Sequence, residues 1–135
     1  MICIDPGVKA CGFALFTEGY LAHAVYCPKT ETPYSGDLMV IEMPRIYPGS
    51  GQQKGDLNDL LDLAAVVGYC EGRFGGRIER VFPARWKGQV PKKIMTARIL
   101  SKLSPLELSK IQRVGAKDHN TIDAIGIGLW KLGRL

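Results

Sequence analysis

The sequence begins MICIDPGVKACGFALF, residues 1–16, and its first apolar run ends in an acid. Asp5 follows the apolar letters ICI and precedes a Pro-Gly pair. A carboxylate inside an apolar strand is costly unless a cation or hydrogen-bond donors compensate it. The stretch therefore predicts a strand over residues 1–5 that delivers a functional carboxylate at its end.

The residues after this stretch predict more strands. Apolar runs at 11–16 and 20–26 follow short turns, so with the first strand they predict an antiparallel meander. Residues 27–37 are polar with two prolines and are expected to be a loop. The run LMVIE at 38–42 fits a central strand buried on both faces, and it also ends in an acid.

The second half of the sequence predicts mainly helices. The expected elements are a turn-rich segment at 47–55, a helix from an Asp56 N-cap to about Cys70, a strand at 78–82, a basic loop at 83–92, a helix at about 92–103, a short helix from the capping box Ser104–Glu107, and a helix at 118–132. A meander followed by a strand–helix–strand crossover gives one mixed sheet. We therefore expect a single α/β domain over residues 1–135.

Two of these helices have a predicted apolar side. In the first helix it consists of Leu57, Leu60, Leu61, Ala64 and Val67. In the last helix it consists of Ile122, Ile125, Gly126, Leu129 and Leu132. Both sets repeat at helical spacing, which predicts that each side faces the core.

The composition excludes several classes of protein. The 135 residues are 46% apolar and 23% charged, and no apolar stretch approaches the ~20 residues of a membrane span. No basic segment precedes the first apolar run, so a signal peptide is not expected. The four cysteines form no C-x-x-C pair, which argues against a zinc site or a disulfide framework and predicts a reducing, cytoplasmic compartment.

The charge is divided unequally along the chain. Residues 1–72 hold four basic and nine acidic side chains, whereas residues 73–135 hold fourteen basic and four acidic ones. This split suggests a carboxylate site together with a polyanionic partner. A solvated basic surface is the alternative explanation.

Three carboxylates could meet in such a fold. If the strands at 1–5 and 38–42 are parallel neighbours, Asp5 and Glu42 lie at the same edge of the sheet. Asp123 is on the last helix, with Asn120 and His119 one turn earlier on the same face. Gathered carboxylates repel one another unless a hard cation such as Mg²⁺ or Mn²⁺ joins them, and two ions ~4 Å apart would suit phosphodiester hydrolysis. Each acid alone could instead be an N-cap, a turn residue or a surface charge.

The last helix carries two glycines that bear on this expectation. Gly126 and Gly128 have no Cβ. We therefore expect this helix to lie close to the sheet, which would bring Asp123 within reach of the two strand acids.

These residues carry a family resemblance. Ile4-Asp5-Pro6-Gly7 with Gly12 resembles the opening motif of the RuvC family of Holliday junction resolvases, Ile41-Glu42 its second strand motif, and residues 120–124 (NTIDA) its last acidic helix. The resemblance covers nearly the whole chain in order. It implies an RNase H-like fold with a five-stranded mixed sheet, two Mg²⁺ ions (Mn²⁺ as substitute) held by four residues, cleavage of four-way DNA junctions, and a homodimer.

The sequence departs from this family at two places. The fourth ligand position holds Asn120, where relatives have Asp or His, and an amide cannot act as a base. His119 or Asp118 could substitute for it. Only 36 residues separate Asp5 from Glu42, and the polar loop among them stands where relatives usually have a helix between strands, as in a short phage-type member. This puts the junction or dimer contacts made by that helix in doubt.

The resemblance also implies which residues contact DNA. Lysines near the scissile phosphate correspond to Lys87 and Lys92. Tyr47 is a candidate for stacking on an unpaired base, and packing of its own turn is the alternative. Trp86 and Trp130 are expected in the core or a dimer contact. The predicted DNA-binding residues are Arg45, Tyr47, Arg85, Lys87, Lys92, Lys93 and Arg98, and Lys102, Lys110, Arg113 and Lys117 extend the basic face.

Three functions are compatible with parts of this pattern. The favoured one is a metal-dependent, structure-selective endonuclease of a bacterium or phage-infected cell, with Asp5, Glu42, Asn120, Asp123 and Lys87 as catalytic residues. The alternative is a junction-binding module whose catalytic site has decayed, as Asn120 suggests. A sugar-kinase or actin-like ATPase would need two such domains, and this chain has room for one.

Overall fold

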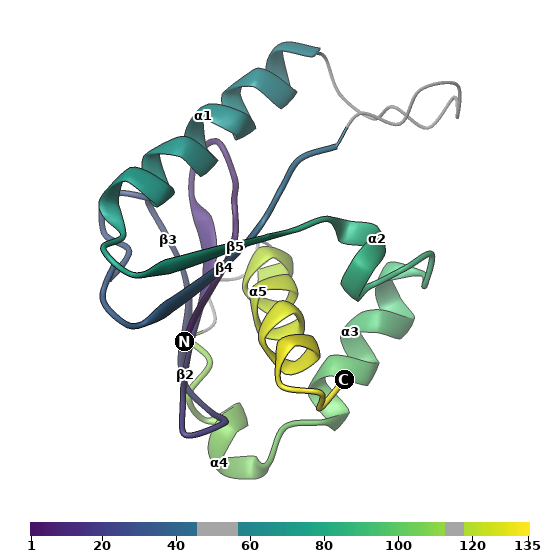
Figure 1. The fold of residues 1–135 in the computed structure, drawn as a ribbon. Coiled ribbons are helices and arrows are strands. Elements are labelled where there is room, and N and C mark those ends of the chain that lie inside the picture. Colours follow the sequence, from purple (N-terminus) through teal and green to yellow (C-terminus); the bar gives the residue numbers. More distant parts are fainter. Residues whose placement is uncertain (46–56, 113–117) are drawn as a thin grey trace.

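Five strands form one sheet in the order β3-β2-β1-β4-β5 (Figure 1). The structure is a computed structural model, and it describes residues 1–45, 57–112 and 118–135. The strands are β1 (Ile2–Asp5), β2 (Cys11–Thr17), β3 (Tyr20–Cys27), β4 (Leu38–Glu42) and β5 (Arg77–Val81). All five lie within one or two residues of the ranges that the sequence predicts.

The sheet is mixed. β1 pairs antiparallel with β2, and β2 pairs antiparallel with β3, which makes the meander. β4 runs parallel to both β1 and β5. β1 and the middle of β4 are buried because these central strands have neighbours on both sides and helices over both faces. The predicted fold class, a three-strand meander with two parallel strands, is confirmed.

Five helices accompany the sheet in the part of the chain that the structure describes. They are α1 (Leu57–Arg73), α2 (Pro83–Trp86), α3 (Lys92–Ser101), α4 (Pro105–Leu108) and α5 (Asp118–Lys131). None of them is long and apolar enough to cross a membrane. The predicted Asp56 cap and the 47–55 segment lie outside the described residues.

The prediction of a loop over 83–92 is wrong for its first four residues. They form α2, in which Pro83 occupies the first turn, where its missing N–H is not needed. α1 also continues one turn past the predicted end at Cys70 and ends at Arg73, before the Gly-Gly pair. The capping box of α4 forms as expected, with the Ser104 side chain and Glu107 each bonding the other's backbone N–H.

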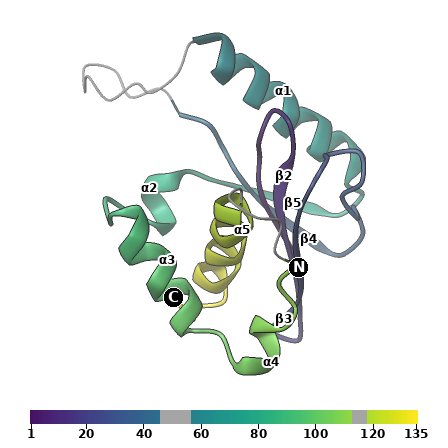
Figure 2. The same ribbon diagram turned by 180° about the vertical axis from the view of Figure 1, so that it is seen from behind.

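The helices pack in two layers on opposite faces of the sheet (Figures 1 and 2). α1 covers one face, where Val66, Val67 and Cys70 join apolar side chains of β1, β2 and β4. α2, α3 and α5 cover the other face with a larger apolar core. α5 runs along the middle of that second face, against β1, β2 and β3, which places one side of it beside the central strands.

The apolar side predicted for α1 is wrong over its first half. Leu57 and Leu61 are 57% and 68% exposed, and Ala64 is exposed as well. Only the second half of the helix lies over the sheet, whereas the first half adjoins Met43 and Pro44 and does not join the core of the described residues (Figure 1). On the last helix, Leu132 is also exposed, because α5 ends at the residue before it.

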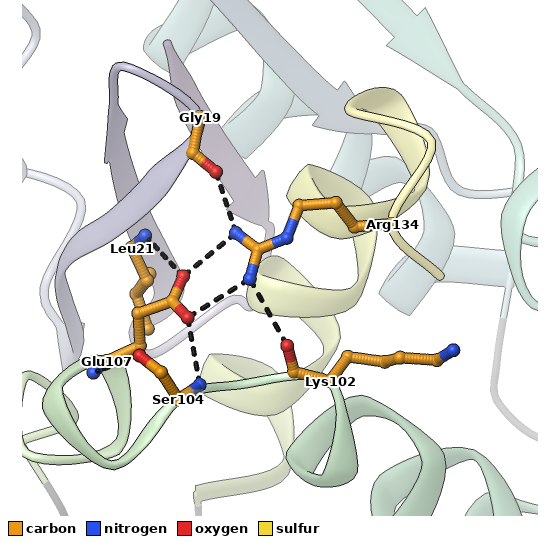
Figure 3. A network of polar contacts seen from close by, with 6 residues as sticks. All are labelled: Gly19, Leu21, Lys102, Ser104, Glu107 and Arg134. Carbon is orange, nitrogen blue, oxygen red and sulfur yellow. Dashed lines mark hydrogen bonds and ion pairs between the residues drawn. The ribbon is translucent and has the colours of Figure 1, made fainter.

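The Glu107 carboxylate on α4 forms hydrogen bonds with the β2–β3 hairpin and with the segment after α5. It accepts hydrogen bonds from the Leu21 backbone N–H and from the Arg134 guanidinium, at 2.9 Å each, and is 3% exposed (Figure 3). The guanidinium also donates to the carbonyls of Gly19 and Lys102. The β2–β3 hairpin is thereby joined to α4 and to the segment after α5.

Edge strand β3 receives a second partner near this network. The Ala24 N–H donates to the Lys110 carbonyl at 3.1 Å, and the Gln112 N–H donates to the Ala24 carbonyl at 2.8 Å. This short bridge at Ile111 covers part of the open edge of the sheet.

We expect Glu107→Gln to destabilise the protein in a pH-dependent way. Arg134 lowers the pKa of Glu107 to about 2, below its unfolded-state value of about 4.3. A carboxyl group whose pKa is lower in the folded than in the unfolded state stabilises the fold fully at pH values above its unfolded-state pKa. This stabilisation is lost as the pH falls toward the folded-state pKa of about 2. Urea unfolding should therefore show a loss of about 2–3 kcal/mol at pH 7 that shrinks between about pH 4 and pH 2.

Glu71→Gln is the matched control for this prediction. Glu71 also bonds an arginine, but that arginine, Arg80, has a side chain 59% exposed, so solvent screens the pair. We expect a much smaller change in stability. A Glu107→Gln variant as stable as the wild type at pH 7 would contradict the role of the network.

Candidate active site

The parallel register of β1 and β4 brings two carboxylates together. Ile4 pairs with Ile41, so the next residues, Asp5 and Glu42, end neighbouring strands at one edge of the sheet. Asp5 is only 8% exposed, and the side chain of Glu42 is 12% exposed. The predicted pairing of these two acids at the sheet edge is confirmed.

The third carboxylate comes from α5, which lies very close to β2. A Cβ added at Gly12 would be 1.9 Å from the Asn120 carbonyl oxygen, so only glycine leaves room for the helix backbone there. Gly12 pairs with Asp5 in the sheet. This contact fixes the first turns of α5 beside the end of β1, and Asp123 is one turn farther along.

The two glycines of α5 have different roles. An added Cβ at Gly128 would be 2.1 Å from the Phe16 ring, so this glycine does let the helix approach the sheet, as predicted. Gly126 faces away from the sheet, because its Cβ would meet Trp86 and Ile99 of α2 and α3. The expected close approach of the helix to the sheet thus depends on Gly128, whereas Gly126 makes room for Trp86 and Ile99.

Lys87 joins two of the three acids. Its Nζ lies 3.2 Å from Asp123 Oδ2 and 3.4 Å from Glu42 Oε2. The side chain is 27% exposed and follows directly after α2. The structure thus brings Asp5, Glu42, Asp123 and Lys87 to one place from four separate elements.

Trp86 contributes to this site, which the sequence interpretation missed. Its indole N–H donates a 2.6 Å hydrogen bond to Glu42 Oε2, and its ring lies 4.8 Å from Lys87 Nζ. The ring is otherwise in the core, as expected, at 5% exposed. A buried tryptophan needs an acceptor for its N–H. Trp86 directly precedes the candidate lysine Lys87, and this position could have indicated that its acceptor is one of the site carboxylates.

The ionisable groups perturb one another. Burial raises the pKa of Asp5 well above its usual range, and the Glu42 and Asp123 carboxylates raise it further. Burial also raises the pKa of Glu42, although Lys87 and the Trp86 hydrogen bond oppose this. Burial would lower the pKa of Lys87, but the three carboxylates outweigh it and the pKa is raised. Such mutual shifts in a cluster are typical of functional sites.

The candidates for the fourth ligand lie at the start of α5. Asn120 is partly buried, and its Nδ2 is 3.1 Å from where a Cβ on Gly7 would stand, so its side chain lies against the turn after Asp5. His119 is exposed. The side chain of Asp118 lies outside the described residues.

The donor set fits a hard divalent cation. Asp5, Glu42, Asp123 and the amide oxygen of Asn120 are all hard oxygen ligands. Among the described residues, the buried Asp5 carboxylate has no hydrogen-bond or ion-pair partner, and the Lys87 and Lys92 charges only partly oppose its raised pKa, so a cation would add the compensation that it needs. Within the same residues, no three Asp, Glu, His or Cys side chains are arranged as a ready metal cage. Lys87 Nζ, not an open space, lies between two of the acids.

A pocket adjoins the acids on the basic side. It has a volume of about 270 Å³ and is lined by Lys87, Gly88, Val90, Lys92, Met95 and Asp123. Arg85, Lys92, Lys93, Arg98, Lys102 and Lys110 are exposed on α2, α3 and the segments beside them. Arg45 lies after β4 with its guanidinium 5.5 Å from the Phe82 ring. The predicted residues Tyr47, Arg113 and Lys117 lie outside the described residues.

Comparison with known proteins supports the fold. No family model matches this sequence, and no curated protein matches it. Among solved structures, Thermus thermophilus RuvC in complex with a Holliday junction substrate matches at 16% identity and a TM-score of 0.59, over 96% of this chain and 91% of that one. Another Thermus thermophilus RuvC structure matches at 15% identity and a TM-score of 0.57, over 96% of this chain and 92% of that one.

These likenesses define the class of fold. The chain has an RNase H-like fold, with its three acids gathered at the edge where β1 and β4 end. Within that class, its arrangement of strands and helices is similar to that of RuvC along nearly the whole chain.

We expect Gly12→Ala to destabilise the protein by about 1–3 kcal/mol, because the added methyl group overlaps the backbone of α5. Chemical denaturation measures the change. Gly68→Ala on α1 is the control: nothing lies within 4 Å of its added Cβ, so the variant should be neutral or up to about 1 kcal/mol more stable. A Gly12→Ala variant with wild-type stability would contradict the close approach.

Proposed function

We propose that this protein is a metal-dependent endonuclease that cuts branched DNA, with the four-way Holliday junction as its substrate. The observation that carries the proposal is the buried Asp5 carboxylate beside Glu42 and Asp123, without a partner among the described residues. The similarity of the fold to Thermus thermophilus RuvC, which has been solved with a Holliday junction substrate, supports the choice of DNA substrate.

The proposed metal ligands are Asp5, Glu42 and Asp123, with Asn120 as the fourth. Two Mg²⁺ ions, or Mn²⁺ in their place, would activate water and stabilise the leaving oxygen when bound. Trp86 orients the Glu42 carboxylate by its hydrogen bond. Asn120 is favoured over His119 because it lies against the turn after Asp5, whereas His119 is exposed.

The surface beside the acids suits a polyanion. Lys87 and Lys92 line the pocket next to Asp123, where they would neutralise a phosphate. Arg85, Lys93 and Arg98 are exposed on the same segments. The basic second half of the chain thus presents its charge next to the acids of the first half, which is the arrangement a phosphodiester hydrolase needs.

We expect Asp5→Asn to abolish cleavage and to retain DNA binding. The amide removes the charge that holds the metal, so nicking of a labelled mobile four-way junction in Mg²⁺ should fall at least about 100-fold. Binding of the junction, measured by gel shift in Ca²⁺, should change only a few-fold, because the basic surface is intact.

Asp37→Asn is the control, since Asp37 is an exposed acid just before β4. It should cleave like the wild type. Cleavage by Asp5→Asn at the wild-type rate would contradict the proposal. If the wild type binds the junction but cuts it in neither Mg²⁺ nor Mn²⁺, the protein is instead a binding module, as Asn120 at the fourth position suggests.

A homodimer would let two active sites cut opposite strands of a junction. The proposed dimer surface is the exposed stripe on α1, where Leu57, Leu60, Leu61 and Ala64 form a groove of about 400 Å³ with Met43 and Pro44. Large exposed apolar patches are typical of protein interfaces, and a two-fold dimer buries the same patch on both copies. The groove begins directly after β4, so pairing there would hold the two sites at a fixed separation.

We expect Leu61→Glu to convert a dimer into a monomer in analytical ultracentrifugation, because it places a charge in the apolar stripe. Paired nicks in the junction should become single, independent nicks. Leu106→Glu on α4 is the control, because Leu106 is exposed to the same extent, 68%, outside the stripe. A dimer that survives Leu61→Glu would exclude this surface.

A further inference from the structure

The ammonium group of Lys87 lies at the place of a cation shared by two of the acids. It is 3.2 Å from Asp123 Oδ2 and 3.4 Å from Glu42 Oε2. These are the same two carboxylates that the proposed function assigns to a metal ion. A divalent cation and an ammonium at one position repel each other strongly, so both cannot occupy it.

The neighbours of Lys87 hold it in this position. The Trp86 ring lies 4.8 Å from Nζ, a cation–π distance, and its N–H fixes the same Glu42 oxygen at 2.6 Å. Glu42 Oε2 therefore accepts a hydrogen bond from Trp86 and forms an ion pair with Lys87 at the same time. The side chains of Glu42, Asp123 and Lys87 are only 12%, 16% and 27% exposed, so solvent screens these contacts only in part.

The three acids are compensated unequally. Glu42 and Asp123 have Lys87, whereas Asp5 has no such partner among the described residues. Lys87 thus forms ion pairs with Glu42 and Asp123, whereas its effect on Asp5 is a longer-range attraction that only partly opposes the raised pKa of that acid. A metal ion held by all three acids would have to compete with the ammonium for Glu42 and Asp123.

Lys87 also has a place to move to. The pocket of about 270 Å³ is lined by Lys87 itself together with Gly88, Val90, Lys92, Met95 and Asp123. Gly88 follows with φ +56°, a turn conformation that favours glycine. Because Lys87 itself lines this pocket, the space for a displaced ammonium adjoins its present position.

We propose that Lys87 is a built-in competitor of the metal: its ammonium occupies the shared position between Glu42 and Asp123 in the metal-free protein, and metal binding displaces it into the adjoining pocket. This inference rests on the proposed metal-dependent function. Its consequence is that metal binding moves a positive charge to the place where a phosphate of the DNA would lie, so the lysine reaches the substrate only after the metal is bound.

Calorimetric titration with Mn²⁺ in the absence of DNA tests the proposal. We expect Lys87→Met to bind Mn²⁺ about tenfold more tightly than the wild type, because the ion no longer has to break two ion pairs. Lys92→Met is the matched control: this lysine lines the same pocket and is exposed, with no ion pair to the acids among the described residues. It should change the affinity less than about threefold.

Thermal unfolding gives a second readout that does not depend on activity. Without metal, Lys87→Met should melt at a lower temperature than the wild type, because the gathered carboxylates lose their cationic contact within the described part of the chain. Saturating Mn²⁺ should raise its melting temperature more than that of the wild type, since tighter binding stabilises the folded state more.

The outcomes separate this inference from the proposed function. Equal or weaker Mn²⁺ affinity in Lys87→Met, with binding by the wild type, overturns the competition while the metal site stands. Absence of Mn²⁺ binding in both proteins overturns the metal site and this inference together. A gain of similar size in Lys92→Met would also overturn it, because the effect would then be general electrostatics rather than displacement of Lys87.

Discussion

The parallel pairing of β1 with β4 is the constraint on which the rest of the structure depends. It places Asp5 and Glu42 at one edge of the sheet, where both strands end. Because β1 is central, Asp5 is almost completely buried there and repels its neighbours. The surrounding elements place partners beside these acids. Trp86 at the end of α2 and Lys87 directly after it contact Glu42, and α5 lies close over Gly12.

The unequal charge along the chain has a structural counterpart. The first half of the sequence supplies the sheet and two of the clustered acids, and the second half supplies the cations beside them. Lys87 is the point where the two halves meet, since it contacts an acid from β4 and another from α5. A phosphate approaching this edge of the sheet would thus meet carboxylates and cationic side chains next to each other, an arrangement that suits a site that must hold both a metal ion and DNA.

Local pattern predicted much of the fold and the place of the three acids. The strands could be predicted because each is a short apolar run between turn residues, and the capping box at Ser104 is a sequence signal in itself. The contribution of Trp86 to the site could not be predicted from local pattern, because its hydrogen bond to Glu42 joins residues 44 positions apart. Periodicity grouped Leu57 and Leu61 on one side of α1, but it carries no information on whether another element covers that side.

The bonds that close the outer edge of the sheet affect how the chain can fold. The β2–β3 hairpin is synthesised well before the segment that closes its outer edge, since backbone groups of Leu21 and Ala24 bond to Glu107, Lys110 and Gln112. Contacts between residues so distant in sequence slow folding, because a long loop must close before they form. The edge of β3 would therefore stay open to other strands until the 104–112 segment has been made and has closed over it, and this closure then protects the edge from aggregation.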